Sequence, residues 1–288
     1  MIRKRILGIL GYICFALGVA GVCVWYGFPY TAYVNTRLAD MRSPLVTVAV
    51  GEAAPLIPMG IGARSVEIVC LTMPGTSRFL VDGVNLRASV LSYVLGKWKT
   101  TMDADLFGGS LKARGTMTPR NMPRELKGTV EFQEIGLKGF APCLSGMDDI
   151  SGTMNGKVYF SGRMDRMTQG EGNATLRVED VAAVLHNPLV AGFVITEGSG
   201  EARVRMHKGR LEILSCTFES AGIKGMLKGK IVFRAPFVKS TMQLEVTLVA
   251  DEAIKKQPSG ISLMMRPGVT HTINFSGTLE QPRVNLVS

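Results

Sequence analysis

The chain has 288 residues, of which 46% are hydrophobic, 19% charged and 7% aromatic, and its formal net charge is +10. This length suits one or two domains with a sizeable core, and no segment has the high charge and low hydrophobicity of a long disordered tail. The excess Lys and Arg residues are scattered instead of clustering with aromatic residues. This pattern argues against a nucleic-acid partner and indicates a basic surface.

The first element in chain order is an apolar segment, residues 6–28, which contains no charged residue. About 20 apolar residues cross the hydrocarbon core of a bilayer as a helix. Arg3, Lys4 and Arg5 precede the segment, so the positive-inside rule predicts a cytoplasmic N-terminus. Trp25 and Tyr26 fall at its far end, where amphipathic rings favour the membrane interface. We therefore expect one transmembrane helix with the rest of the chain exported.

A cleaved signal peptide is the main alternative to a retained anchor. Its apolar region would span about 7–15 residues, which is shorter than this one. The small-residue site Gly18-Val19-Ala20 lies inside the apolar run, and neither Cys14 nor Cys23 follows the small residue that lipidation requires. These features favour a helix that stays in the mature protein.

The remaining sequence predicts three regions. Residues 1–30 are expected to form the cytoplasmic stub and the transmembrane helix, and residues 31–63 a proline-containing linker with a first strand. Residues 64–288 contain short alternating segments separated by glycines, which predict many short strands. We expect a mainly β domain with a curved, mostly antiparallel sheet (an open barrel, a trough or a sandwich). Amphipathic segments at residues 86–95 and 140–147 predict one or two short capping helices.

Two of the alternating segments carry the candidate binding surface. In each of them apolar side chains occupy every second position, and a strand places such residues on one face. If helices cover these faces, the residues form a core. If the faces are left open, they form a contact surface for a partner protein or lipid. The residues are Met154, Val158, Phe160, Met242, Leu244, Val246 and Leu248.

Catalytic chemistry has no sequence support. The three histidines are not grouped with cysteines or carboxylates at the spacing of a metal site, and the motifs of serine hydrolases, phosphate-binding loops and dinucleotide folds are missing. We expect no catalytic residue, no metal and no cofactor. Cys70, Cys143 and Cys216 follow the anchor; they allow one disulfide or free thiols, and free thiols are favoured.

Several stretches together resemble a known family. They are the basic start, the apolar segment ending in Trp25-Tyr26-Gly27-Phe28-Pro29, and the Gly-rich phrases at residues 105–115, 150–156 and 225–242. This layout resembles the type II secretion system protein N family over nearly the whole chain. The ending at residues 275–284 resembles AsmA-like proteins of the bacterial envelope. The similarity rests on overall layout and not on an invariant motif, and the family has no catalytic residues to carry over.

The resemblance implies a single-pass protein of the bacterial inner membrane with its C-terminal domain in the periplasm. It would be a non-enzymatic accessory component of the type II secretion apparatus that contacts other platform or channel subunits. Residues 241–250 and 272–279 are the expected edge strands for such a partner. The AsmA-like ending implies an alternative, a periplasmic lipid-binding or lipid-transfer protein that uses an apolar trough in the sheet.

Overall fold

The structure is a computed structural model of the whole chain. It describes residues 15–16, 19–20, 23, 25–40, 46–57, 59–73, 75–89, 91–92, 95–118, 125–143, 147–163, 169–185, 193–220, 222–234, 239–256, 266–278 and 281–287. These residues are mainly β, with a few short helices, and they divide into two compact units, Met1–Arg87 and Ala88–Ser288.

The first unit contains helix α2 (Tyr30–Asp40) and the antiparallel strands β1 (Val46–Leu56), β2 (Gly60–Met73) and β3 (Gly75–Ala88). Val50, Val66 and Val81 are cross-strand neighbours on these strands, and all three are buried. Helix α2 lies beside β1, where the side-chain amide of Asn35 bonds both the N–H and the C=O of Val50, each at 2.9 Å. Asn35 therefore pairs with β1 as a neighbouring strand would.

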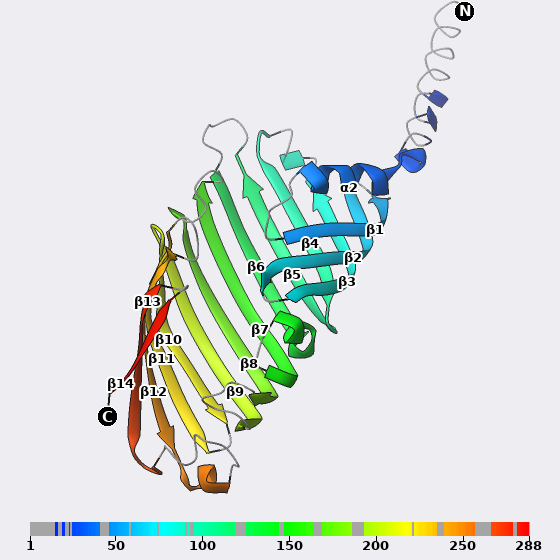
Figure 1. Cartoon of the computed structure of the whole chain (residues 1–288). Helices are drawn as coiled ribbons and strands as arrows, with labels where there is room; N and C mark the ends of the chain where they lie inside the picture. The colour runs from blue at the N-terminus through cyan, green and yellow to red at the C-terminus, as the bar shows by residue number, and fades with distance from the viewer. Residues whose placement is uncertain are drawn as a thin grey trace, which may run out of the picture. The chain divides into compact units, whose positions relative to one another are not determined.

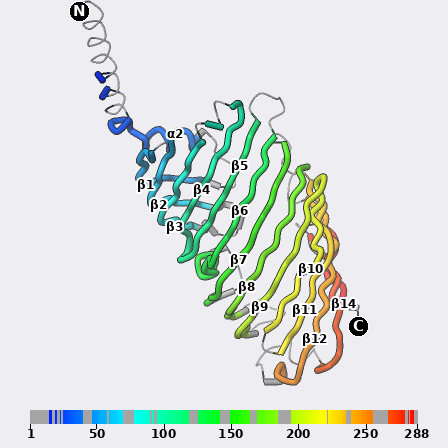
Figure 2. Tube along the Cα trace, turned by 180° about the vertical axis from the view of Figure 1, so that it is seen from behind, coloured from blue at the N-terminus to red at the C-terminus, as the bar shows by residue number. Residues whose placement is uncertain are grey.

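The second unit is one antiparallel sheet in which each strand pairs with the next along the chain (Figure 1). Its strands are β4 (Trp98–Leu106), β5 (Gly109–Met117), β6 (Glu125–Gly136), β7 (Met147–Arg163), β8 (Glu171–Leu185), β9 (Phe193–His207), β10 (Arg210–Ser220), β11 (Ile223–Val232), β12 (Thr241–Ala250), β13 (Thr270–Thr278) and β14 (Pro282–Val287). The sheet twists steadily from β5 to β14, as the tube in Figure 2 shows from behind. It is open, because β14 pairs with β13 alone among the described strands.

Successive connections in this unit alternate between the two ends of the strands. One end holds two 3-10 helices, η1 (Leu137–Cys143) between β6 and β7, and η4 (Glu252–Lys256) between β12 and β13. We call it the capped end, and we call the opposite end, where β9 turns into β10 at Lys208, the far end. In Figure 1 η1 is the green coil beside the end of β7.

The buried apolar side chains of the second unit gather at the capped end. Leu137 of η1 packs with Ile150 and Ala183, and Ile254 of η4, which is fully buried, packs with Ile223 and Ala250, so that each 3-10 helix closes a small cluster. β-Bulges at Glu134 and Asp180, both with positive φ, shift the register of β6 and β8 at this end. A bulge bends its strand and increases its twist, which turns these strand ends toward η1.

The structure confirms a mainly β fold with an antiparallel sheet, and it corrects two finer expectations. The helix expected at residues 86–95 begins later, because β3 continues to Ala88; Leu91 and Ser92 are helical, and the N–H of Leu95 donates to the carbonyl of Leu91 at 3.1 Å. The side chains of Leu86, Leu91 and Leu95 are exposed by 45%, 73% and 72%, so they do not form the expected buried face. A helical turn does cap the sheet near residue 140, as expected, although it begins at Leu137.

The expected edge strands are also wrong. Strand β12 lies between β11 and β13, and β13 lies between β12 and β14, so both have neighbours on each side. The short strand β14 forms the edge. Alternation along a single strand identifies its two faces, but it does not reveal how many neighbours follow it in the sheet.

No helix in the described part of the chain is long and apolar enough to cross a membrane. Most of residues 6–28, including Arg3, Lys4 and Arg5 before them, lie outside the described residues, and the anchor stays a prediction. Trp25 and Tyr26 belong to a short described helical stretch, where the Trp25 ring makes an edge contact with Tyr30 at 6.0 Å between centroids.

Candidate functional site

The two faces of the second unit's sheet differ sharply in chemistry. Residues paired across an antiparallel ladder lie on the same face, so each register pairing extends a row from strand to strand. Following these pairings from β4 to β14 places apolar residues and glycines on one face and polar or charged residues on the other. We call them the apolar face and the polar face.

Four adjacent rows make up the apolar face. The row through Leu248 is Ile135, Met154, Val178, Gly200, Phe218, Gly225, Leu248 and His271. The row through Val246 is Ala104, Leu111, Phe132, Gly156, Leu176, Ala202, Cys216, Leu227, Val246 and Ile273. The row through Leu244 is Met102, Ala113, Val130, Val158, Ala174, Val204, Ile213, Gly229, Leu244, Phe275 and Val284. The row through Met242 is Thr100, Gly115, Gly128, Phe160, Gly172, Met206, Leu211, Ile231, Met242 and Gly277.

The predicted binding residues fall into these rows and are aligned across six strands, from β7 to β12. Met154 shares a row with Leu248, Val158 with Leu244, and Phe160 with Met242, while Val246 lies in the remaining row. The two segments that the sequence singled out therefore belong to one continuous surface. The sequence did not reveal the strands between them, whose apolar residues are interrupted by glycines.

The middle of the apolar face is only partly covered. Among the described residues of the second unit, the buried apolar side chains lie at the capped end, whereas Val158, Leu244 and Val246 are half-buried. Toward the edge, Phe218 is 37% and Val284 50% exposed. A core row sealed by a second layer would have exposures near those of Ile135, which is 0% exposed.

The size of this face sets it apart from ordinary surface hydrophobicity. Ten spacings of about 4.8 Å between strands give roughly 50 Å, and six residues along a strand at about 3.4 Å give roughly 20 Å. The apolar band thus has a footprint on the order of 1,000 Å², of which only part is exposed because its middle residues are half-buried. A large contiguous apolar surface that stays partly exposed marks a site of interaction.

Glycines on the apolar face lie against large side chains. A Cβ on Gly225 would overlap the ring of Phe218, and a Cβ on Gly156 would come within 2.6 Å of Leu176 Cδ2. Small residues next to large ones let the large side chains lie down along the sheet. The face is consequently smooth and apolar, without a polar side chain in its two middle rows.

The polar face is held by ion pairs between and along strands. Asp103, Lys112, Glu131 and Lys157 alternate in sign across β4 to β7, and the Nζ of Lys157 lies 2.7 Å from a carboxylate oxygen of Glu131. A hydrogen bond and the positive charge of Lys157 lower the pKa of Glu131. Such exposed pairs contribute little to stability, yet they keep this face solvated and distinct from the other.

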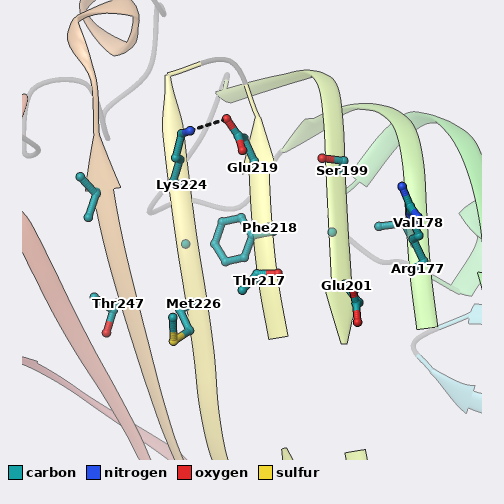
Figure 3. A pocket seen from close by; sticks show the side chains of 13 residues that line it. Arg177, Val178, Ser199, Glu201, Thr217, Phe218, Glu219, Lys224, Met226 and Thr247 are labelled. Atoms are coloured by element: carbon teal, nitrogen blue, oxygen red, sulfur yellow. Dashed lines mark ion pairs between the residues drawn. The ribbon is translucent and has the colours of Figure 1, made fainter. Parts of the chain in front are cut away.

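A shallow hollow lies on the polar face over β8 to β12 (Figure 3). Its charged groups are already paired, Lys224 with Glu219 at 2.7 Å and Glu201 with Arg203 at 2.8 Å. The hydrogen bond with Glu219 raises the pKa of Lys224, so the amine stays protonated. Because these charged groups are paired with one another, none of them is placed to act as a nucleophile or a general base.

The sequence predicts no metal site and favours free thiols, and the structure bears on these two expectations only at the described residues. Among them no group of three or more His, Cys, Asp and Glu could hold a metal ion. His207 is paired with Glu171 at 3.1 Å, and His186 lies outside the described residues. Cys216 is free and half-buried on the apolar face, and burial raises the pKa of its thiol. The side chains of Cys70 and Cys143 lie outside the described residues.

Comparisons with known proteins found no matching family model, no matching curated protein and no matching solved structure. The geometry of the sheet therefore carries the functional argument.

Proposed function

We propose that the second unit binds the acyl chains of lipids on its apolar face. The observation that carries this proposal is the band of apolar residues and glycines that crosses every strand from β4 to β14 and remains half-buried in the middle. Lipid tails need no hydrogen-bonding groups, and the side chains of the two middle rows offer none except the weak thiol of Cys216. A protein partner would have to cover this band with an equally apolar surface that carries no unpaired polar group.

The shape of the band also suits extended chains. The two middle rows run from β4 to at least β13, perpendicular to the strands, so an extended hydrocarbon chain can lie along a row in contact with successive side chains. Met102, Met154, Met206 and Met242 lie within the four rows, and the flexible thioether of methionine adapts to occupants of different shape. The proposed class of ligand is therefore a lipid with one or more long acyl chains.

In the same proposal residues 6–28 anchor the chain in the bacterial inner membrane, with a cytoplasmic N-terminus and a periplasmic sheet. The basic residues before the segment and its uninterrupted apolar length support this orientation. An anchored sheet with an apolar face would receive lipid at the membrane and hold it away from water, without any catalytic step.

Native mass spectrometry of the full chain, extracted from membranes, tests the lipid proposal. The double variant Val158→Glu/Leu244→Glu places two carboxylates in one row of the apolar face, and we expect it to retain fewer bound lipids than the unchanged protein. The matched control, Tyr159→Glu/Gln243→Glu, changes the neighbouring residues on the polar face of the same strands. Lipids around the anchor are common to both variants, so equal lipid occupancy in the two would contradict the proposal.

A second candidate function is contact with other subunits of the type II secretion apparatus. The observation that favours it is the edge strand β14, which pairs with β13 alone among the described strands and leaves exposed residues such as Arg283 and Asn285. An unpaired strand edge can accept a strand from a partner.

Site-specific photo-crosslinking in native cells tests this second function. A photoreactive residue at Asn285, on the edge, is expected to capture a secretion subunit, whereas the same residue at Tyr159, exposed in the middle of the polar face, is not. Capture at neither position, or equal capture at both, would count against a specific partner at β14.

A further inference from the structure

The two ends of the second unit's strands differ in charge. We consider the first or last three residues of each strand together with the described residues of the adjoining connections. At the far end these positions carry eleven basic and three acidic residues. The basic residues are Lys97, Lys99, Lys127, Arg163, Arg205, Lys208, Arg210, Lys230, Arg234, Lys239 and Arg283. The acidic residues are Glu125, Glu171 and Glu212.

All eleven basic side chains at the far end are exposed. They come from seven different strands and from the connections between them, and the antiparallel order brings them to one end although they are far apart in the sequence. The capped end is mixed in sign, with Glu134 and Glu219 beside Lys138 and Lys224. The excess positive charge of the chain, scattered along its sequence, is thus gathered at one end of the sheet.

We propose that the far end docks on an anionic membrane surface. The basic residues are spread over roughly 50 Å along the row of strand ends, which matches a plane of headgroups and not a single phosphate. Clusters of four to eight Lys or Arg residues already suffice to hold a protein at a membrane that contains anionic lipid.

The acidic residues at the far end do not cancel this charge. Three acids against eleven basic residues leave an excess of eight positive charges, even though Glu171 lies 3.1 Å from His207 and Glu212 lies 3.8 Å from Arg210. Lys97, Lys208 and Lys239 are exposed on three separate connections, and each can reach a surface beyond the strand ends. This docking does not depend on lipid binding to the apolar face, because it uses the strand ends and not the rows.

A distance measurement on the full chain in vesicles tests the proposal. A fluorophore is attached at Gln281→Cys, an exposed position in the far-end turn between β13 and β14, in a background without the native cysteines. Energy transfer to an acceptor on the lipid headgroups is compared between neutral phosphatidylcholine vesicles and vesicles that also contain phosphatidylglycerol. The matched control carries the fluorophore at Thr270→Cys, which is exposed at the capped end.

We expect energy transfer at Gln281→Cys to rise with phosphatidylglycerol and to fall back in high salt, with little change at Thr270→Cys. The triple variant Lys97→Glu/Lys208→Glu/Lys239→Glu should lower the docked-to-undocked ratio at least about tenfold, because each basic residue at an anionic surface changes this ratio several-fold. The double variant Tyr159→Glu/Gln243→Glu, which adds two carboxylates to the polar face, should behave as the unchanged chain. Equal energy transfer in neutral and anionic vesicles, or no effect of the triple variant, would overturn the proposal, and an acidic protein would then be the better partner.

Discussion

The ring of Phe218 on β10 occupies the space that a Cβ of Gly225 on the adjacent strand β11 would need. Figure 3 shows this ring lying between the two strands. The contact illustrates how the apolar face is built, since a large side chain lies flat only where its neighbour has none. It also makes glycine a requirement at this position for reasons of space.

Gly225→Ala is therefore expected to push the Phe218 ring off the sheet and to destabilise the protein by about 1–2 kcal/mol, as overpacking does. Gly128→Ala is the control, because a Cβ there would meet only an ordinary contact at 3.5 Å, to the carbonyl oxygen of Arg114. Denaturant unfolding of both variants checks this. A loss of stability at Gly128 equal to that at Gly225 would contradict the steric explanation.

The capped end should contribute more to stability than the middle of the apolar face. Ile254→Ala removes a fully buried side chain of η4, and we expect a loss of about 2–5 kcal/mol in the free energy of unfolding. Val158→Ala removes a half-buried side chain from the middle of the face and is expected to cost about 1 kcal/mol or less. Equal losses in the lipid-free protein would indicate that the middle of the face is packed as a core.

Helix α2 should depend on the amide of Asn35. Asn35→Ala removes two hydrogen bonds and leaves the N–H and C=O of Val50 without the side-chain amide, at an expected cost of about 1–3 kcal/mol. Thr36→Ala is the matched control, since this hydroxyl bonds only the carbonyl of Ala32 within the helix. Faster hydrogen exchange at the Val50 amide in the Asn35 variant, but not in the Thr36 variant, would confirm the role of Asn35.

The reactivity of Cys216 should report on the apolar face. Burial raises the pKa of this thiol, and only the thiolate reacts with alkylating agents. At a given pH less thiolate is present, so the midpoint of the pH–rate profile should lie above that of an unhindered cysteine, about 8.5. Alkylation resolved by peptide mass spectrometry measures this profile, with the urea-unfolded chain as reference. A folded midpoint at or below the unfolded one would contradict the burial.

The sequence predicted the faces of the strands better than their order. The alternation around Val158 and Leu244 is local, so the shared face could be inferred without knowing the neighbours. The helical pattern of residues 86–95 was equally local, but β3 extends to Ala88 and takes the start of that segment, so the helical part lies around Leu91 and its apolar side chain is exposed. The pairing of β3 with β2 therefore determines where the strand ends, although the sequence of the same segment also has a helical periodicity.

Other features depend on residues that meet only in the folded chain. The edge at β14 follows from the number of strands, and the bulge at Glu134 follows from the way β6 meets η1. The charged far end combines residues from connections throughout the second unit, among them Lys97 and Lys239. A scattered positive charge in the sequence gives no sign of such a gathering until the antiparallel order of the strands is known.

Photo-crosslinking to lipid tests the central claim most directly. A photoreactive residue is placed in the full chain at Leu244, on the apolar face, or at the adjacent Gln243, on the polar face of the same strand. After irradiation in native membranes, we predict peptides carrying the added mass of a lipid acyl chain at position 244 and not at position 243. Lipid adducts at both positions alike, or at neither, would contradict an acyl-chain site on the apolar face.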